Sequence, residues 1–140
     1  MKKNNIEIFD EAMVRILTSL YDSFPVPKAI NYMQIISIYQ PKIPSDRNEQ
    51  YEEIYLNTFN FLENEGFIKI AKKADESSSI FYGCILTSKG FSKLRGKVNP
   101  LDDPSPSIIE QLKILRDNGV VDTGKAIIAN VVKNFLTSGT

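Results

Sequence analysis

The sequence predicts an α+β, mostly helical fold with a C-terminal helical extension. Two observations lead to this prediction. Apolar residues recur at helical spacing near the N-terminus and again near the C-terminus. Between them, residues 59–94 indicate the end of a helix at Gly66, a strand, a polar turn, a second strand and a short closing helix. At 140 residues, we expect one domain with an appendage.

The first two helices are predicted from apolar spacing and from the positions of prolines. Residues 5–22 form an amphipathic helix, because their apolar side chains fall on one stripe. That stripe consists of Ile6, Phe9, Met13, Ile16, Leu17 and Leu20. Pro25 interrupts the helix, since proline cannot continue it. Pro27 suits the first turn of a second, mostly buried helix, which we expect over residues 28–39.

A third helix follows a loop with two prolines at residues 40–45. Asp46 and Glu49 have the spacing of a capping box at its N-terminus. Gly66 is expected to end it in the left-handed conformation. One stripe of this helix is predicted to face the core and consists of Tyr51, Ile54, Tyr55, Thr58, Phe61 and Leu62.

Two strands and a closing helix come next. Residues 67–72 alternate as a first strand, and residues 80–86 have the period of a second strand. One parity of the second strand contains Ile80, Tyr82, Cys84 and Leu86. This parity predicts that Cys84 is a buried core thiol. Thr87 or Ser88 is expected to cap the closing helix.

The remainder of the chain predicts a linker and two further helices. Residues 99–107 contain three prolines and two adjacent aspartates, so we divide the chain into a domain at 1–98, a linker at 99–107 and a helical extension at 108–140. The last helix has a broad apolar face that must be buried. We expect it to cross to a second subunit and form a homodimer, with packing inside one chain as the alternative. The dimerisation residues would be Ile127, Ile128, Val131, Val132 and Phe135.

The order of three helices, a hairpin and a closing helix resembles the winged-helix superfamily, in its small bacterial or phage-encoded type, over about residues 6–96. The specific match is FLENEGFI, which leads into a hairpin that ends in ILTSKGFSKL. The matching positions are Leu62, Gly66, Phe67, Ile68, Leu86, Thr87 and Gly90. The resemblance implies DNA binding, with the third helix in the major groove and the tip of the two-stranded wing against the backbone. It also implies dimerisation through terminal helices.

The charge distribution modifies this implication. Residues 46–65 hold six acidic residues against Arg47, a net charge of −5, whereas residues 66–99 have a net charge of +5. Because phosphates attract cations and repel carboxylates, we expect a DNA-binding transcriptional regulator that acts mainly through its wing. The candidate nucleic-acid-binding residues are Lys42, Arg47, Asn57, Asn60, Lys69, Lys72 and Lys73.

Three alternatives stay open. The acidic helix is also typical of a solvated face, and the lysines are typical of a strand edge that discourages pairing between molecules. The alternative function is a protein–protein interaction module without DNA binding. It would use the acidic third helix and the apolar C-terminal helix as contact surfaces, with a basic protein as a candidate partner.

Composition argues against an enzyme. The chain has no histidine and one cysteine, which excludes imidazole bases and an intramolecular disulfide. We therefore expect no catalytic residues, no metal and no cofactor. The N-terminal residues lack the apolar run of a signal peptide, and no stretch approaches the roughly 20 apolar residues of a membrane span. We expect a soluble, cytoplasmic protein without a membrane partner.

Overall fold

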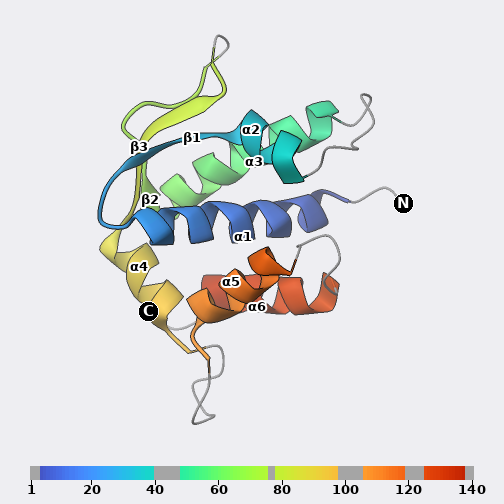
Figure 1. The fold of residues 1–140 in the computed structure, drawn as a ribbon, viewed down its shortest axis with the longest axis vertical. Helices are drawn as coiled ribbons and strands as arrows, with labels where there is room; N and C mark the ends of the chain where they lie inside the picture. Colours follow the sequence, from blue (N-terminus) through green and yellow to red (C-terminus); the bar gives the residue numbers. More distant parts are fainter. Residues whose placement is uncertain (1–3, 40–47, 76–77, 98–105, 119–124, 138–140) are drawn as a thin grey trace.

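The computed structural model describes residues 4–39, 48–75, 78–97, 106–118 and 125–137. Within these ranges it contains six helices and a three-stranded antiparallel sheet, which confirms the predicted α+β, mostly helical class (Figure 1). The strands lie in the order β1-β3-β2. In chain order the elements are α1 (Asn5–Ser23), β1 (Lys28–Asn31), α2 (Tyr32–Tyr39), α3 (Asn48–Asn64), β2 (Ile68–Lys69), β3 (Ile80–Leu86), α4 (Ser88–Arg95), α5 (Ile108–Asp117) and α6 (Lys125–Thr137).

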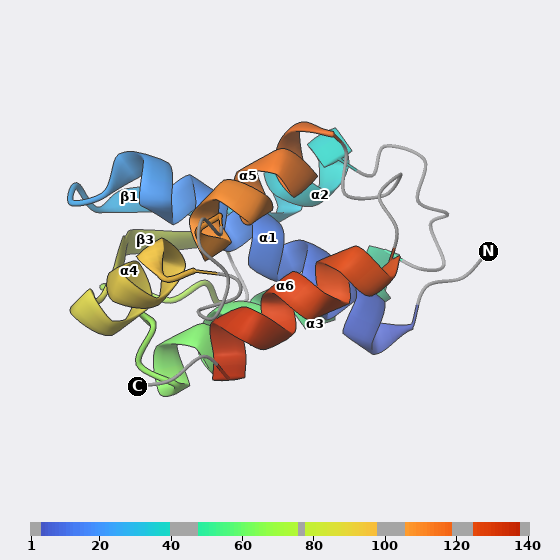
Figure 2. The same cartoon turned by 90° about the horizontal axis from the view of Figure 1, so that it is seen from below.

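Helix α1 lies at the centre of the molecule. It runs between α3 and the sheet on one side and α5 and α6 on the other (Figures 1 and 2). Between Ile8 and Leu20 every residue is buried except Phe9 and Ser19, which are half-buried. The prediction of an amphipathic helix therefore described only one of its faces, because the polar face is covered as well. The polar and charged residues buried along this helix are Asp10, Glu11, Arg15 and Thr18.

The predicted second helix over residues 28–39 is wrong in its first third. Lys28–Asn31 form strand β1, which pairs antiparallel with β3, and Ile30 is buried. The helix begins only at Tyr32, because the Asn31 side chain accepts hydrogen bonds from the backbone N–H groups of Met33 and Gln34 at 3.0 and 3.2 Å. This is N-cap geometry, and it starts α2 while the preceding residues complete the sheet.

Helix α3 ends as predicted. Gly66 has a φ of 82°, the left-handed conformation expected after a helix C-terminus. The stripe that was predicted to face the core is buried at Tyr51, Tyr55, Thr58 and Leu62, whereas Ile54 and Phe61 are half-buried. The loop at 40–45 and the Asp46 cap lie outside the described residues.

The hairpin of β2 and β3 is confirmed, but β2 is shorter than the predicted strand at 67–72. Beyond Lys69 the two arms of the hairpin are joined by isolated bridges, between Lys72 and Tyr82 and between Asp75 and Ser78. Strand β3 also departs from strict alternation. Between two points of pairing with β1, three steps of β3 face two steps of β1, and Gly83 in this stretch has a φ of 64°. This bulge places Phe81 in the core together with Cys84, while Tyr82 is exposed.

The last three helices are anchored to this core. Thr87 caps α4, and Ser107 and Glu110 form a capping box at the start of α5. Most of the predicted linker lies outside the described residues. The two helices after it share the hydrophobic core of α1, and the ring of Phe135 in α6 packs against that of Phe67 at 4.7 Å between centroids.

Replacement of Gly83 by alanine is expected to destabilise the fold by about 2 kcal/mol or more. The positive φ alone costs a residue with a Cβ roughly 1–2 kcal/mol. In addition, the new Cβ would lie 2.6 Å from the Cβ of Ala71. Urea unfolding of Gly83→Ala and of the double variant Gly83→Ala/Ala71→Gly separates the two effects. The second change should restore the steric part only, and unchanged stability in Gly83→Ala would contradict the bulge.

The contribution of Asp10 to the stability of the protein is expected to fall as pH rises from about 4 to 6. Burial, with a contribution from the nearby Glu7 carboxylate, raises the pKa of Asp10 from 3.8 to about 6. The folded state therefore keeps a proton that the unfolded chain releases, so the cost of ionising Asp10 is absent below pH 4 and complete above pH 6. Asp10→Asn should stabilise the protein at pH 7 by about 1–3 kcal/mol. Its gain should vanish near pH 3.5 in chemical unfolding; an equal gain at both pH values would contradict this origin.

Candidate nucleic-acid interface and neighbouring cavities

The hairpin of β2 and β3 presents lysines to solvent. Lys69, Lys72 and Lys73 are all exposed. The ammonium of Lys72 lies 5.8 Å from the centroid of the Tyr82 ring, and 43% of the surface of Tyr82 is exposed. Among the described residues, Lys69 has no ion-pair partner. The hairpin therefore offers cations and one aromatic ring on the same element.

Lys73 differs from the other two lysines because it joins the hairpin to α3. Its Nζ lies 2.8 Å from the Glu63 carboxylate, and about half of the Lys73 side chain remains exposed. An exposed pair of this kind contributes about 0–1 kcal/mol. Its main effect is to hold the hairpin against α3 and to cancel one positive charge.

The outward surface of α3 is acidic, as predicted: Glu49 and Glu53 are exposed, and Glu52 is half-buried. Asn57 is exposed and donates its amide to the backbone carbonyl of Glu53 at 2.8 Å. At 100° per residue, Asn57 lies about 120° around the helix from Glu63, which marks the side of the hairpin. The structure therefore does not bring Asn57 together with the wing lysines.

Asn60 lies between these two sides of α3. Its side-chain Oδ1 is enclosed and accepts no hydrogen bond from any described residue. The remaining two candidates, Lys42 and Arg47, lie outside the described residues.

The basic residues that follow β3 have structural contacts. Lys89 donates to the carbonyl of Glu65 at 2.8 Å, and Lys93 donates to the carbonyl of Phe135 at 3.2 Å. The guanidinium of Arg95 lies 5.3 Å from the ring centroid of Phe91. These side chains tie α4 to the end of α3 and to α6. The net charge of +5 in residues 66–99 is therefore divided between the lysines of the hairpin and the basic residues of α4, which have structural contacts.

A groove of about 390 Å³ lies between the N-terminal part of α1 and α3. Its apolar residues are Phe9, Ile54 and Phe61, and the rings of Phe9 and Phe61 meet edge to face at 5.4 Å. The polar residues around them are Asn5, Gln50, Glu53, Asn57 and Thr58. The groove is therefore lined by three apolar side chains, several neutral polar ones and one carboxylate.

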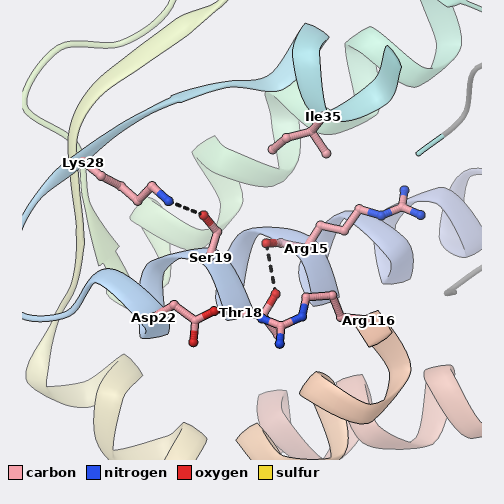
Figure 3. Close-up of a pocket in the computed structure, with 7 residues that line it drawn as sticks. All are labelled: Arg15, Thr18, Ser19, Asp22, Lys28, Ile35 and Arg116. Carbon is pink, nitrogen blue, oxygen red and sulfur yellow. Dashed lines mark hydrogen bonds and ion pairs between the residues drawn. The ribbon is translucent and has the colours of Figure 1, made fainter. Parts of the chain in front are cut away.

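A second cavity, of about 230 Å³, lies where the C-terminal half of α1 meets β1, α2 and α5 (Figure 3). Its lining residues are Arg15, Thr18, Ser19, Asp22, Lys28, Ile35 and Arg116. Sequence reasoning could not find this cavity, because its residues are up to 101 positions apart and Lys28 was expected on a helix. Tyr82 was missed for a different reason, since strict alternation placed it with Cys84.

Cys84 is buried as predicted, with no exposed surface. Burial, with a smaller effect of the Glu63 carboxylate, raises the pKa of its thiol to about 11. A thiol in this state is a poor nucleophile, because the thiolate is the reactive form. In the part of the chain that the structure describes, no three His, Cys, Asp or Glu side chains gather as a metal site would require.

The predicted dimerisation residues lie mostly inside the single chain. Ile128, Val131, Val132 and Phe135 are buried against the shared core, whereas Ile127 is 53% exposed. Within one chain, the apolar face of α6 is thus covered by intramolecular packing, the arrangement that was the alternative. The homodimer stays a prediction.

Comparison of the chain with protein-family models, with curated proteins and with solved structures finds no match. None of the helices in the described ranges has both the length and the apolar character that a membrane crossing requires.

Proposed function

We propose that residues 5–97 form a winged-helix domain that binds duplex DNA through its wing. The order of its elements supports the proposal: α1, β1, α2 and α3 precede the hairpin of β2 and β3, and β1 pairs with the outer side of that hairpin. Strand β1 was not expected from the sequence, and it gives the hairpin a three-stranded base. The resemblance implies a bacterial or phage-encoded protein, and the expected cytoplasmic location would bring such a protein into contact with duplex DNA.

The observation that carries the DNA proposal is the exposure of Lys69, Lys72 and Tyr82 on the one hairpin. Affinity for DNA comes largely from cations that displace counterions from phosphates. Lys69 and Lys72 have no carboxylate partner among the described residues, so their charge is available. Lys73 joins them when its pair with Glu63 opens, at a cost of about 1 kcal/mol or less.

The acidic surface of α3 sets the mode of binding. Glu49, Glu52 and Glu53 would meet repulsion from phosphates if α3 entered a groove. We infer that the wing makes the main contacts and that α3 stays apart from the duplex. Contacts to phosphates without base contacts position a protein but do not select a sequence. Binding should therefore depend steeply on salt and little on sequence.

Reversal of charge on the hairpin should abolish binding. With three lysines on phosphates, the logarithm of the association constant should fall with that of salt at a slope of about −3. Lys72→Glu should weaken binding about tenfold or more, and Lys72→Glu/Lys73→Glu should remove it. Fluorescence anisotropy with a labelled duplex, at salt concentrations from about 50 to about 200 mM, measures the salt slope and the affinities of the variants.

Lys133→Glu is the matched control, because Lys133 is exposed on α6, a helix that lies on the opposite side of α1 from β3 (Figure 1). It makes the same change in net charge and should bind within about threefold of the unmodified protein. No affinity of the unmodified protein for duplex DNA at low salt would overturn the proposal, and so would equal losses in Lys72→Glu and Lys133→Glu.

A second candidate function is favoured by the groove between α1 and α3. Phe9, Ile54 and Phe61 supply its apolar lining and Glu53 its carboxylate. Glu49 lies one turn earlier on the same side of α3. A partner that fits this surface carries apolar side chains flanked by lysine or arginine. We propose such a basic, amphipathic segment of another protein as its occupant, since its charge complements that of α3.

A synthetic amphipathic peptide of leucine and lysine tests this second function. It should bind more tightly than the same peptide with glutamate in place of lysine, and Glu53→Gln should weaken it several-fold. Glu65→Gln is the control, because Glu65 is exposed beyond the end of α3 and does not line the groove. Peptide fluorescence titrations give these affinities; equal binding of both peptides, or no effect of Glu53→Gln, would exclude this partner class.

A further inference from the structure

The cavity between α1, β1, α2 and α5 is rich in hydrogen-bond donors. Lys28 reaches into it from the start of β1, and Arg116 reaches into it from the last turn of α5 (Figure 3). Ser19 and Asp22 lie between them on α1. Residues from three separate parts of the chain therefore meet at one small opening.

Lys28 has only a neutral partner in this cavity. Its Nζ donates to the Ser19 hydroxyl oxygen at 2.9 Å, and no carboxylate bonds it among the described residues. An ammonium has three N–H groups, so two remain for another acceptor. Because Ser19 accepts from Lys28, its own hydroxyl proton is free to be donated. These two side chains thus supply three donors and one uncompensated positive charge.

Two of the three nitrogens of the Arg116 guanidinium are already in use. Its Nη1 donates to Asp22 at 2.8 Å and its Nε donates to Asp117 at 3.0 Å. The remaining nitrogen, Nη2, makes no hydrogen bond within the described residues. Arg116 is therefore fixed in place by two carboxylates while it keeps donors for a third acceptor.

Asp22 is the carboxylate of this cavity, and it is already shared. It accepts from Arg116 and also lies 3.2 Å from the Nζ of Lys113. Burial raises its pKa, but the hydrogen bonds from these two cations outweigh that effect and lower the pKa overall. Asp22 therefore stays ionised and occupied, and it does not neutralise Lys28.

Arg15 adds neither a donor nor an uncompensated charge at this point, because the Glu11 carboxylate lies 3.7 Å from its Nη1. Its guanidinium extends away from Lys28 and Arg116 (Figure 3) and donates to the Tyr55 hydroxyl at 2.9 Å. Thr18 likewise uses its hydroxyl proton within α1, on the carbonyl of Val14 at 2.8 Å. The open donors of the cavity consequently come from Lys28, Ser19 and Arg116.

We propose that this cavity binds the oxyanion group of a small molecule, a phosphate or a carboxylate, between Lys28, Ser19 and Arg116. Three cationic residues and one carboxylate line it, and its free groups are donors, which an oxyanion satisfies and a cation does not. At about 230 Å³ it is smaller than the usual site for a drug-sized ligand. The bound oxyanion would connect β1 to α5, because it accepts hydrogen bonds from Lys28 and from Arg116. This site is independent of the proposed DNA contact.

Inorganic phosphate and acetate, each compared with chloride at equal ionic strength and pH, test the site and distinguish the two oxyanions. One of them should raise the midpoint of thermal unfolding in a saturable manner, because a ligand that binds only the folded state stabilises it. Calorimetric titration gives the affinity. Lys28→Met should weaken that affinity about tenfold or more, since it removes a charged hydrogen bond. Lys133→Met makes the same charge change on exposed α6 and should leave it unchanged.

Ser19→Ala is the second variant and should weaken binding several-fold, so the test remains available if Lys28→Met fails to fold. The absence of a saturable effect of both anions over chloride would overturn the proposal, as would equal affinity in all variants. Neither outcome bears on the wing, because Lys28→Met should bind duplex DNA as the unmodified protein does. A large loss of DNA binding in Lys28→Met, without phosphate or acetate binding, would show that the cavity receives a DNA phosphate instead and would also overturn the proposal.

Discussion

Between Ile8 and Leu20, helix α1 has almost no surface that faces solvent, and this constraint governs the rest of the structure. A helix covered on all sides must place its polar side chains somewhere inside. Arg15 solves this problem by donating to the Tyr55 hydroxyl at 2.9 Å, with Glu11 one turn away at 3.7 Å. Burial raises the pKa of Tyr55 to about 12, so its hydroxyl stays neutral. Removal of one member of such a buried group leaves another polar group without compensation, which costs several kcal/mol.

The same constraint explains why the helices after residue 107 belong to the core. The sequence divides the chain at a linker rich in proline, but α5 and α6 cover a face of α1 that would otherwise expose apolar and charged groups together. Helix α6 also contacts the segment that leads into the hairpin and helix α4. Phe135 packs on Phe67 beside the first strand of the hairpin, and Lys93 donates to the Phe135 carbonyl. The described helices therefore form one core around α1.

Periodicity predicted most elements, because helix and strand periods, caps and glycines are local signals. It correctly gave α1, the end of α3 at Gly66, the hairpin and the cap at Thr87. It missed β1, since Lys28–Asn31 become a strand only through pairing with residues more than 45 positions later. Asn31 followed by Gln34 was the local signal for a later helix start. The bulge at Gly83 was also missed, because alternation is counted on one strand and a bulge is a property of two. The candidate site was chosen from the number of charges in each segment, and such counts carry no information about geometry. They could not show that Lys73 is paired with Glu63 or that Asn57 lines the groove beside α1. They also could not show that Lys28 and Arg116 line one cavity.

The burial of α1 also has a consequence for the order in which the molecule is made. Helix α6 begins at Lys125, about a hundred residues after the helix it covers. During synthesis, the central helix therefore emerges long before its final neighbours. Native contacts over such separations form slowly, because a long loop must close first. Until then the growing chain exposes the face that α5 and α6 will cover, and in the cell that interval is when a chaperone has most to bind.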